Sequence, residues 1–284
     1  MRFFVFTLFP QLIKSYAEYG IVKQAISKRV IELLAIDIRS FAHKKQVDDK
    51  AYGGHPGMVI KPEPVFLAYE EVVKNYGKPH TIVPQPWGRR ITQCDLDRLS
   101  TFENLAVICG RYEGLDERVC ALADEELSLG DFVLAGGELF ALVLLEGISR
   151  LLPGVLSEPE SIRRDSFRRW LGPPVYTRPA DFRGMKVPKA LLSGNHQLIR
   201  LWELWHSIER TLKLRPELVP KDLNRLEASM LSAIMDGEDF ESWLEEVGHE
   251  RAIKSFQSMQ LSGGGYDIPE GKSTAERTSQ EGTP

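Results

Sequence analysis

The sequence predicts an α/β domain with a largely parallel sheet, followed by a small helical domain. In roughly the first 155 residues, short runs of β-forming residues bounded by Pro or Gly alternate with amphipathic stretches, a pattern typical of α/β layers. Further along, apolar residues recur every three or four positions, as they do on one face of a helix. These patterns divide the chain into an α/β domain (1–158), a basic linker (159–175), a helical domain (176–260) and a disordered tail (261–284).

The elements follow in order along the chain. We expect strands at 3–8, 81–83, 105–109 and 132–134, and helices at 65–76, 115–123 and 137–152, the last ended by Pro153-Gly154. Residues 157–194 have few periodic apolar positions and are expected to form extended loops. Apolar stripes then predict helices over 198–212 and 223–234, and a further helix is expected over 240–256. From Ser262 onward the chain is polar and rich in Gly, Pro, Ser and Thr, which is typical of disorder.

Composition is that of a soluble globular protein, with 43% hydrophobic and 27% charged residues among 284. No apolar run approaches the roughly 18–20 residues that span a bilayer, and the opening segment has no signal-peptide pattern. The cysteines, Cys94, Cys109 and Cys120, are odd in number and lack metal-ligand spacing. A reduced, cytoplasmic protein with no membrane partner is therefore expected.

The charge is unevenly distributed. The net charge of −4 argues against nucleic-acid binding as a whole, yet residues 161–200 carry nine Lys or Arg against two acids. By contrast, residues 236–250 carry seven acids and no Lys or Arg. A basic segment on an acidic protein predicts contact with phosphates, and the alternative is a solvated, arginine-rich linker.

Four Gly-rich clusters, at 52–57, 86–89, 109–114 and 128–138, lie at the ends of predicted strands. Ligands of open α/β sheets bind beyond the carboxyl ends of the strands, where glycine lets the backbone approach them. The spacing matches neither G-x-G-x-x-G nor G-x-x-x-x-G-K-[ST], which argues against dinucleotide and Walker-type phosphate binding. Each cluster taken alone is more often a tight turn, whereas three of them after predicted strands, beside charged residues, favour a ligand site.

Seven motifs occur in order: VDDKAYGGHPGM (47–58), CGRYEGLDER (109–118), SLGDFVLAGGE (128–138), PGVL (153–156), DSF (165–167), YTRP (176–179) and LLSGNH (191–196). Over about residues 1–247 the chain resembles the TrmD family, the bacterial tRNA (guanine-N1-)-methyltransferases of the SPOUT superfamily. The resemblance implies a SPOUT domain with a deep trefoil knot, and a homodimer whose active sites are shared between subunits. It further implies transfer of a methyl group from S-adenosylmethionine to N1 of the guanosine at tRNA position 37, immediately 3′ of the anticodon.

The resemblance also assigns residues by motif position. It implies cofactor contacts, mainly through backbone groups, from Pro84, Gln85, Pro86, Gly88, Gly110, Tyr112, Glu113, Ser128, Leu129, Gly130, Phe132, Leu134, Gly136 and Gly137. It implies tRNA contacts from Asp48, Ser166, Tyr176, Arg178, Ser193, Asn195 and His196. Activity in the family is linked to Mg²⁺, for which Asp165 is an acceptable ligand. No residue pattern marks a metal site, since His196 lacks a partner at ligand spacing.

The resemblance places the catalytic groups at Asp165 and Arg150. Methylation of guanine N1 requires removal of the N1 proton while negative charge builds on O6, so a carboxylate base and a nearby cation suit the reaction. The alternatives are a surface Asp165 paired with neighbouring arginines, and an Arg150 favoured by the helix dipole. Arg111 and Glu113 could form a structural ion pair. Helix capping is the competing explanation for Asp48 and the adjacent Asp49.

Two positions depart from the family pattern. Trp87 stands in a Gln-Pro-Trp-Gly run where the family has Ser-Pro-Gln-Gly, and His55 replaces a glycine. Three other functions compete with the family reaction. These are methylation of another RNA position by the same superfamily, RNA binding without catalysis, and a nucleotide-dependent dehydrogenase. The last lacks its glycine fingerprint.

Overall fold

The computed structural model describes residues 1–54, 56–157, 162 and 164–261. Contacts divide the chain into two compact units, Met1–Pro159 and Glu160–Pro284. The predicted disorder of residues 262–284 and the effect of His55 lie outside the described residues. Among those described, no helix is both long enough and apolar enough to cross a membrane.

The first unit is built on a parallel sheet, as the sequence predicted. Its five strands lie in the order β2-β1-β6-β5-β7, and all neighbours pair in parallel. The strands are β1 (Arg2–Thr7), β2 (Glu32–Asp37), β5 (His80–Arg90), β6 (Asn104–Ile108) and β7 (Glu125–Ser128). A separate hairpin pairs β3 (Asp48–Lys50) with β4 (Met58–Ile60).

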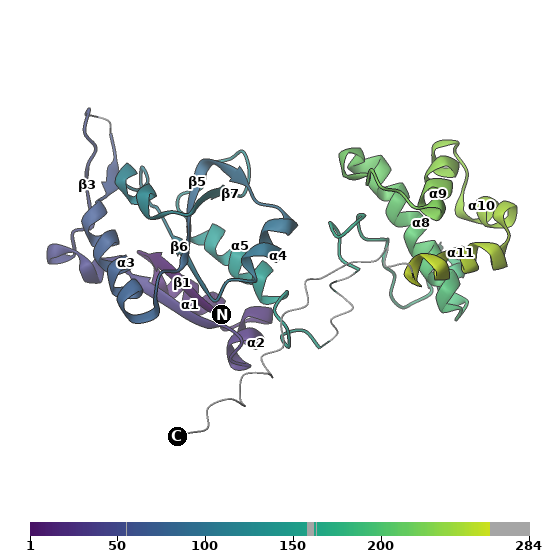
Figure 1. Cartoon of the computed structure of the whole chain (residues 1–284), viewed down its shortest axis with the longest axis horizontal. Coiled ribbons are helices and arrows are strands. Elements are labelled where there is room, and N and C mark those ends of the chain that lie inside the picture. Colours follow the sequence, from purple (N-terminus) through teal and green to yellow (C-terminus); the bar gives the residue numbers. More distant parts are fainter. Residues whose placement is uncertain (55, 158–161, 163, 262–284) are drawn as a thin grey trace, which may run out of the picture. The chain divides into compact units, whose positions relative to one another are not determined.

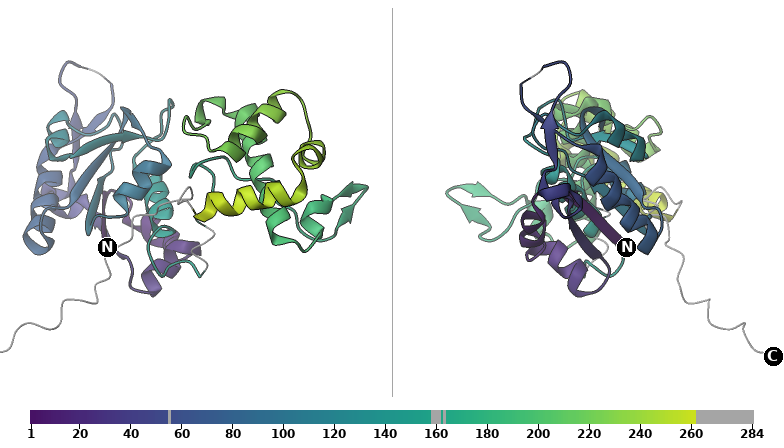
Figure 2. Two further views of the ribbon diagram at one scale, coloured as in Figure 1. Left: turned by 45° about the vertical axis from the view of Figure 1, so that its right-hand side comes forward. Right: turned by 90° about the vertical axis from the view of Figure 1, so that its left-hand side faces the viewer.

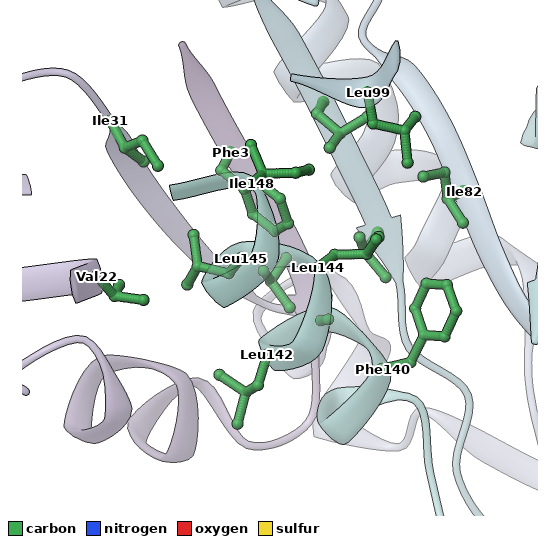
Figure 3. Close-up of a cluster of buried hydrophobic side chains, with 14 of the residues drawn as sticks. Phe3, Val22, Ile31, Ile82, Leu99, Phe140, Leu142, Leu144, Leu145 and Ile148 are labelled. Carbon is green, nitrogen blue, oxygen red and sulfur yellow. The ribbon is translucent and has the colours of Figure 1, made fainter. Parts of the chain in front are cut away.

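Helices cover both faces of the sheet, because successive side chains of a strand point to opposite faces. Phe3 and Val5 of β1 join one apolar cluster with α1 (Pro10–Tyr16), α2 (Gly20–Ser27), α4 (Gln93–Leu99) and α5 (Glu138–Ser149). Figure 3 shows part of this cluster, including Ile148 from α5 beside Phe3. Phe4 and Phe6 point the other way and join a second apolar cluster with residues of α3 (Pro62–Tyr76) and the 3-10 helix η3 (Glu117–Leu122). Figure 1 shows α3 on one side of the sheet and α5 on the other. Two further 3-10 turns are η1 (Ile38–Phe41) and η2 (His43–Lys45).

Two predicted elements of the first unit need correction, and two of its strands were not predicted. The strand predicted at 132–134 is wrong, since these residues form an irregular loop in which Val133 is 83% exposed. These β-forming residues do not make a strand, because glycines on both sides let the chain turn outward as a loop. The helix predicted at 115–123 is the shorter 3-10 helix η3. Strand β2 was missed because neither Pro nor Gly bounds it, and β7 was missed because three of its four residues, Glu-Glu-Leu-Ser, are polar.

The second unit is helical at its centre. Its elements are α7 (Lys189–Leu192), α8 (His196–Leu214), η4 (Pro216–Leu218), α9 (Arg225–Met235), α10 (Phe240–Val247) and α11 (His249–Leu261). Trp170, Trp202, Trp205 and Trp243 lie in its apolar core. The single helix predicted at 240–256 is two helices, because the chain turns at Gly248, whose φ is 84°.

A two-stranded hairpin belongs to the same unit, within the stretch predicted to be extended loop. It pairs β8 (Asp181–Phe182) with β9 (Met185–Lys186), and both turn residues, Arg183 and Gly184, have positive φ. Positive φ at both turn positions suits the right-handed twist of a tight hairpin. Figure 2 shows the hairpin extending away from the helices of its unit.

Candidate active site

A cavity of about 830 Å³, its open mouth included, is formed by the middle of β5 and by the segments that follow β6 and β7. The β5 segment, Pro84–Trp87, lies where the pairing of β5 with β7 is interrupted, and the other two segments follow the carboxyl ends of their strands, where ligands of open α/β sheets bind. All but one of the predicted cofactor residues line it, namely Pro84, Gln85, Pro86, Gly110, Tyr112, Glu113, Ser128, Leu129, Gly130, Phe132, Leu134, Gly136 and Gly137. Thus three segments that are separate in the sequence form one continuous wall.

At two positions glycine is required, because another segment of backbone passes too close to leave room for a Cβ atom. A Cβ on Gly137 would lie 2.9 Å from the Cα of Cys109 and 3.3 Å from the ring of Pro84. The Gly137 amide also donates to the carbonyl of Gly110 over 3.0 Å, which joins two of the cavity loops. Gly88, the predicted residue that does not line the cavity, lies against β7, where its Cβ would be 2.7 Å from the Leu127 amide nitrogen. The absence of a Cβ at Gly88 therefore allows β5 and β7 to pack closely, and Gly88 does not face the cavity.

Arg111 is held by an acid other than Glu113. Its Nε donates to Glu138 over 2.8 Å, its guanidinium carbon lies 4.6 Å from the centre of the Phe9 ring, and Glu138 is fully buried. The second carboxylate oxygen of Glu138 accepts from Thr7 over 2.7 Å. Glu113 instead lines the cavity, with its backbone amide bonded to Met58 in the β3–β4 hairpin.

The sequence reasoning missed Glu138, although one signal was available. Glu138 is the first residue of α5, directly after Gly136-Gly137, and the N-terminus of a helix favours an acidic side chain. Its pairing with Arg111 ties the second cavity loop to the start of α5. Arg111 therefore does form a structural ion pair, as expected, but its partner is Glu138 and not Glu113.

Trp87 forms part of the cavity wall. Its side chain is 68% exposed, and its indole nitrogen donates to the Glu126 carboxylate over 2.8 Å. The hydrogen bond fixes the edge of the ring, so the large side chain has a defined place at the rim. The unusual residue of the first loop is thus accommodated by a partner on β7.

None of the three cysteine side chains lines the cavity. Cys94, Cys109 and Cys120 are all free. Burial, followed by the charge of Glu138, raises the pKa of the Cys109 thiol well above its ordinary value of 9.0. A protonated, fully buried thiol is a poor nucleophile.

The predicted catalytic residues lie in different units. Arg150 is the C-cap of α5 in the first unit, a position where the helix dipole also favours a cation. Asp165 lies half-buried in the second unit, and its amide donates to Ile162 over 3.2 Å. The adjacent Ser166 accepts from the Gly172 amide over 2.9 Å.

The predicted tRNA contacts also divide between the units. Asp48 lies in β3 together with Asp49, so neither caps a helix. Tyr176 is 50% exposed, with its ring centre 6.1 Å from that of Trp202 on α8, and Arg178 is exposed.

The SGN segment forms the entry to α8. Asn195 accepts from the amides of Gln197 and Leu198 as the N-cap of this helix, and Ser193 accepts from the Asn195 amide over 3.1 Å. His196 is exposed at the first position of the helix. The four second-unit residues Tyr176, Ser193, Asn195 and His196 thus lie at or beside one helix.

Comparison with known proteins decides the family. A family model described as tRNA (Guanine-1)-methyltransferase TrmD matches residues 1–221. The chain belongs to the TrmD family. A tRNA (guanine-N(1)-)-methyltransferase of Aquifex aeolicus (strain VF5) is 58% identical over 250 residues, 88% of this chain and 97% of that protein. The corresponding protein of Persephonella marina is 47% identical over 251 residues, 87% of this chain and 99% of its own length.

A solved structure extends the match to the fold. The crystal structure of the tRNA (m1G37) methyltransferase from Aquifex aeolicus has a TM-score of 0.65 and 56% sequence identity, covering 80% of this chain and 98% of that one. The predicted fold class of the TrmD family, a parallel α/β SPOUT domain with a helical C-terminal region, is confirmed. The trefoil knot stays a prediction.

Proposed function

We propose that this chain transfers a methyl group from S-adenosylmethionine to N1 of the guanosine at position 37 of tRNA. The observation that carries the proposal is the convergence of three loops on one cavity in a chain of the TrmD family. The relatives named above are called tRNA (guanine-N(1)-)-methyltransferases, and this chain matches them over nearly their whole lengths. The same residues leave the dehydrogenase alternative without its glycine fingerprint.

The cavity suits the proposed cofactor. Its wall is largely backbone at Gly110, Gly130, Gly136 and Gly137, so amides and carbonyls are available to the polar edge of an adenine and to hydroxyls. Apolar side chains, including Phe132, complete the lining. When bound, S-adenosylmethionine supplies an electrophilic methyl on a sulfonium, which leaves as a neutral thioether after transfer.

In the proposed mechanism, Asp165 accepts the N1 proton of guanine. The deprotonated N1 would then be the nucleophile for the methyl group of the bound cofactor, and the guanidinium of Arg150 stabilises the negative charge that develops on O6. The products are N1-methylguanosine, the thioether and one proton. A carboxylate is a weak base near neutral pH, so its placement and the cation at O6 carry the catalysis.

A second copy of the chain is part of the proposal. Helices α1 and α5 lie side by side in the first unit, where the Tyr16 hydroxyl donates to Glu146 over 3.0 Å. Leu12 and Tyr16 on α1, and Leu139 and Val143 on α5, are each about 39–52% exposed and spaced four residues apart. Rows of exposed apolar side chains on adjacent helices are typical of a subunit interface. We therefore place a homodimer contact here, with active sites shared between subunits.

We propose that the second unit contacts the tRNA. Besides Tyr176 and Arg178, the β8–β9 hairpin presents Phe182 and Met185 at 52% and 65% exposure. The guanidinium carbon of Arg183 lies 5.2 Å from the centre of the Phe182 ring. Exposed rings flanked by cations suit unstacked RNA bases and their phosphates.

Magnesium enters no step of this mechanism. Within the described part of the chain, no group of three or more His, Cys, Asp or Glu side chains is placed to hold a metal ion. As tRNA is the substrate, we place the enzyme in the cytoplasm.

Mass spectrometry of tRNA incubated with the protein and cofactor tests the proposal. The expected product carries one methyl group on guanosine 37, and a matched tRNA with adenosine at that position stays unmodified. Methylation elsewhere would instead indicate another reaction of the superfamily. Calorimetry that detects no binding of S-adenosylmethionine would indicate an RNA-binding protein without catalysis.

A further inference from the structure

The segment that carries Asp165 is closed into a loop by its own hydrogen bonds. The Gly172 amide donates to the Ser166 hydroxyl over 2.9 Å, and the Phe167 amide donates to the carbonyl of Trp170 over 3.2 Å. Asp165 and Ser166 therefore move with residues 170–172. Whatever holds the far side of this loop also determines where Asp165 lies.

A buried carboxylate on α9 holds that far side. Glu227 is 1% exposed and accepts from Arg169 twice, from Nε over 2.6 Å and from Nη2 over 2.7 Å. The indole nitrogen of Trp170 donates to the same carboxylate over 3.0 Å, and the Asn224 amide over 3.1 Å. The two oxygens of a carboxylate have about four acceptor sites, and these four hydrogen bonds occupy all of them.

Helix α8 adds two further attachments. The Leu171 amide donates to the buried hydroxyl of Thr211 over 2.9 Å, and Arg210 donates to the Gly172 carbonyl over 2.6 Å. The loop is thus fixed to both α8 and α9. In the sequence it had the composition of a linker.

The Glu227 carboxylate is kept in its charged form. Burial acts to raise its pKa, but the hydrogen bonds from Arg169, Trp170 and Asn224 outweigh burial, and the pKa lies below its ordinary value of 4.5. A buried ion pair contributes little more to stability than apolar side chains of the same volume would, because both charges lose their hydration. Its directional bonds instead select one arrangement of the loop.

We propose that Glu227, through Arg169 and Trp170, is a positioning residue for Asp165 in the methyl transfer. The inference rests on the proposed function, since it assigns Asp165 the role of base. Glu227 touches neither the cavity nor the guanine in this scheme. It acts by holding the loop that presents the base.

Glu227→Gln gives the sharpest test, because it keeps the volume and removes the charge. All four groups that face the carboxylate are donors, so the amide nitrogen of glutamine necessarily points at a donor. Trp170→Phe is the second variant, as it keeps the ring in the core and removes one N–H. Trp243→Phe is the matched control, since it also removes an indole N–H from the same core, one that donates to Ser229 over 3.1 Å.

The variants are compared by amide hydrogen exchange and by steady-state methyl transfer. We expect faster exchange at the amides of residues 166–172 in Glu227→Gln, and a fall in kcat of about 10- to 100-fold, as for a displaced catalytic group. The KM for tRNA and the Kd for S-adenosylmethionine should change far less than kcat. Introduced into an Asp165→Ala background, Glu227→Gln should slow the residual rate no further, whereas Trp243→Phe should have the same small effect in both backgrounds.

Each outcome decides between the two proposals. Unchanged exchange at 166–172, or a kcat no lower than that of Trp243→Phe, overturns the positioning role while leaving the proposed function intact. The same applies if Glu227→Gln slows Asp165→Ala as much as it slows the wild type. A wild-type protein that methylates no tRNA overturns the proposed function, and the role of Glu227 in it falls as well.

Discussion

Gly137→Ala is expected to weaken cofactor binding by narrowing the junction between two cavity loops. The added Cβ would lie 2.9 Å from the Cα of Cys109, so the two backbones must separate by about 0.5 Å to reach the 3.4 Å of ordinary contact. That movement stretches the 3.0 Å bond from the Gly137 amide to Gly110. Overpacking of this kind costs about 1–3 kcal/mol. Because the cofactor requires the original spacing of these loops, a cost of this size opposes binding. As about 1.4 kcal/mol is a factor of ten in affinity, the Kd for S-adenosylmethionine should rise about tenfold.

Calorimetric titration measures this change, and a thermal melt shows whether the variant remains folded. A unit of this size should lose about 2–4 °C in Tm per kcal/mol. Gly147→Ala is the matched control on the same helix, because its Cβ would meet only the flexible end of Leu96, at 2.7 Å. Its Kd should equal that of the wild type. A folded Gly137→Ala protein that binds the cofactor with wild-type affinity would refute the close-approach argument.

Three further predictions concern the second unit and the shared site. Asp165→Ala should reduce methyl transfer by at least about 100-fold while leaving the calorimetric Kd for S-adenosylmethionine unchanged, and wild-type turnover would disprove the base assignment. Mixing Asp165→Ala with Gly137→Trp subunits should restore activity, because a site shared between subunits is then intact once per heterodimer; continued inactivity after verified mixing would count against sharing. The pKa of Glu227 is depressed by its bonds from Arg169, Trp170 and Asn224 in spite of burial, so the stability from its charge is present above its ordinary 4.5 and is lost as the pH falls. In urea titrations, the wild type should therefore exceed Glu227→Gln in free energy of unfolding most at neutral pH and less below pH 4.5, and a constant difference would contradict the linkage.

The cavity loops could be predicted because their signals are local. The strands at β1 and β6 read as continuous apolar runs, since both faces of a parallel sheet are buried. The glycines that follow β6 and β7 mark places where backbones approach closely, as at Gly137 and Cys109. Because the carboxyl ends of parallel strands share one edge, the predicted strand at β6 also placed the loop after it, whereas the loop after β7 was placed by its glycines and by the family motif, since β7 itself was missed.

The pairings that complete the site could not be predicted in the same way. Arg111 binds Glu138, 27 residues later, and Arg169 binds Glu227, 58 residues later. An arginine can pair with any acid that the fold brings near, so local patterns do not identify its partner. The same limit explains why residues 164–172 resembled a linker. Their basic composition was visible, while the buried carboxylate that neutralises Arg169 lay in a distant helix.

Close backbone contacts at glycines and ion pairs between distant residues contribute to different parts of the proposed reaction, each in a different unit. The proposed cofactor cavity is lined by residues of the first unit, where backbone approach at glycines sets its shape. The proposed base depends on the second unit, where a buried ion pair sets the conformation of its loop. Substitutions at Gly137 should therefore act on cofactor affinity, and substitutions at Glu227 on the rate of transfer. A Glu227 variant that bound S-adenosylmethionine as weakly as Gly137→Ala would mean that the two functions are not separable in this way.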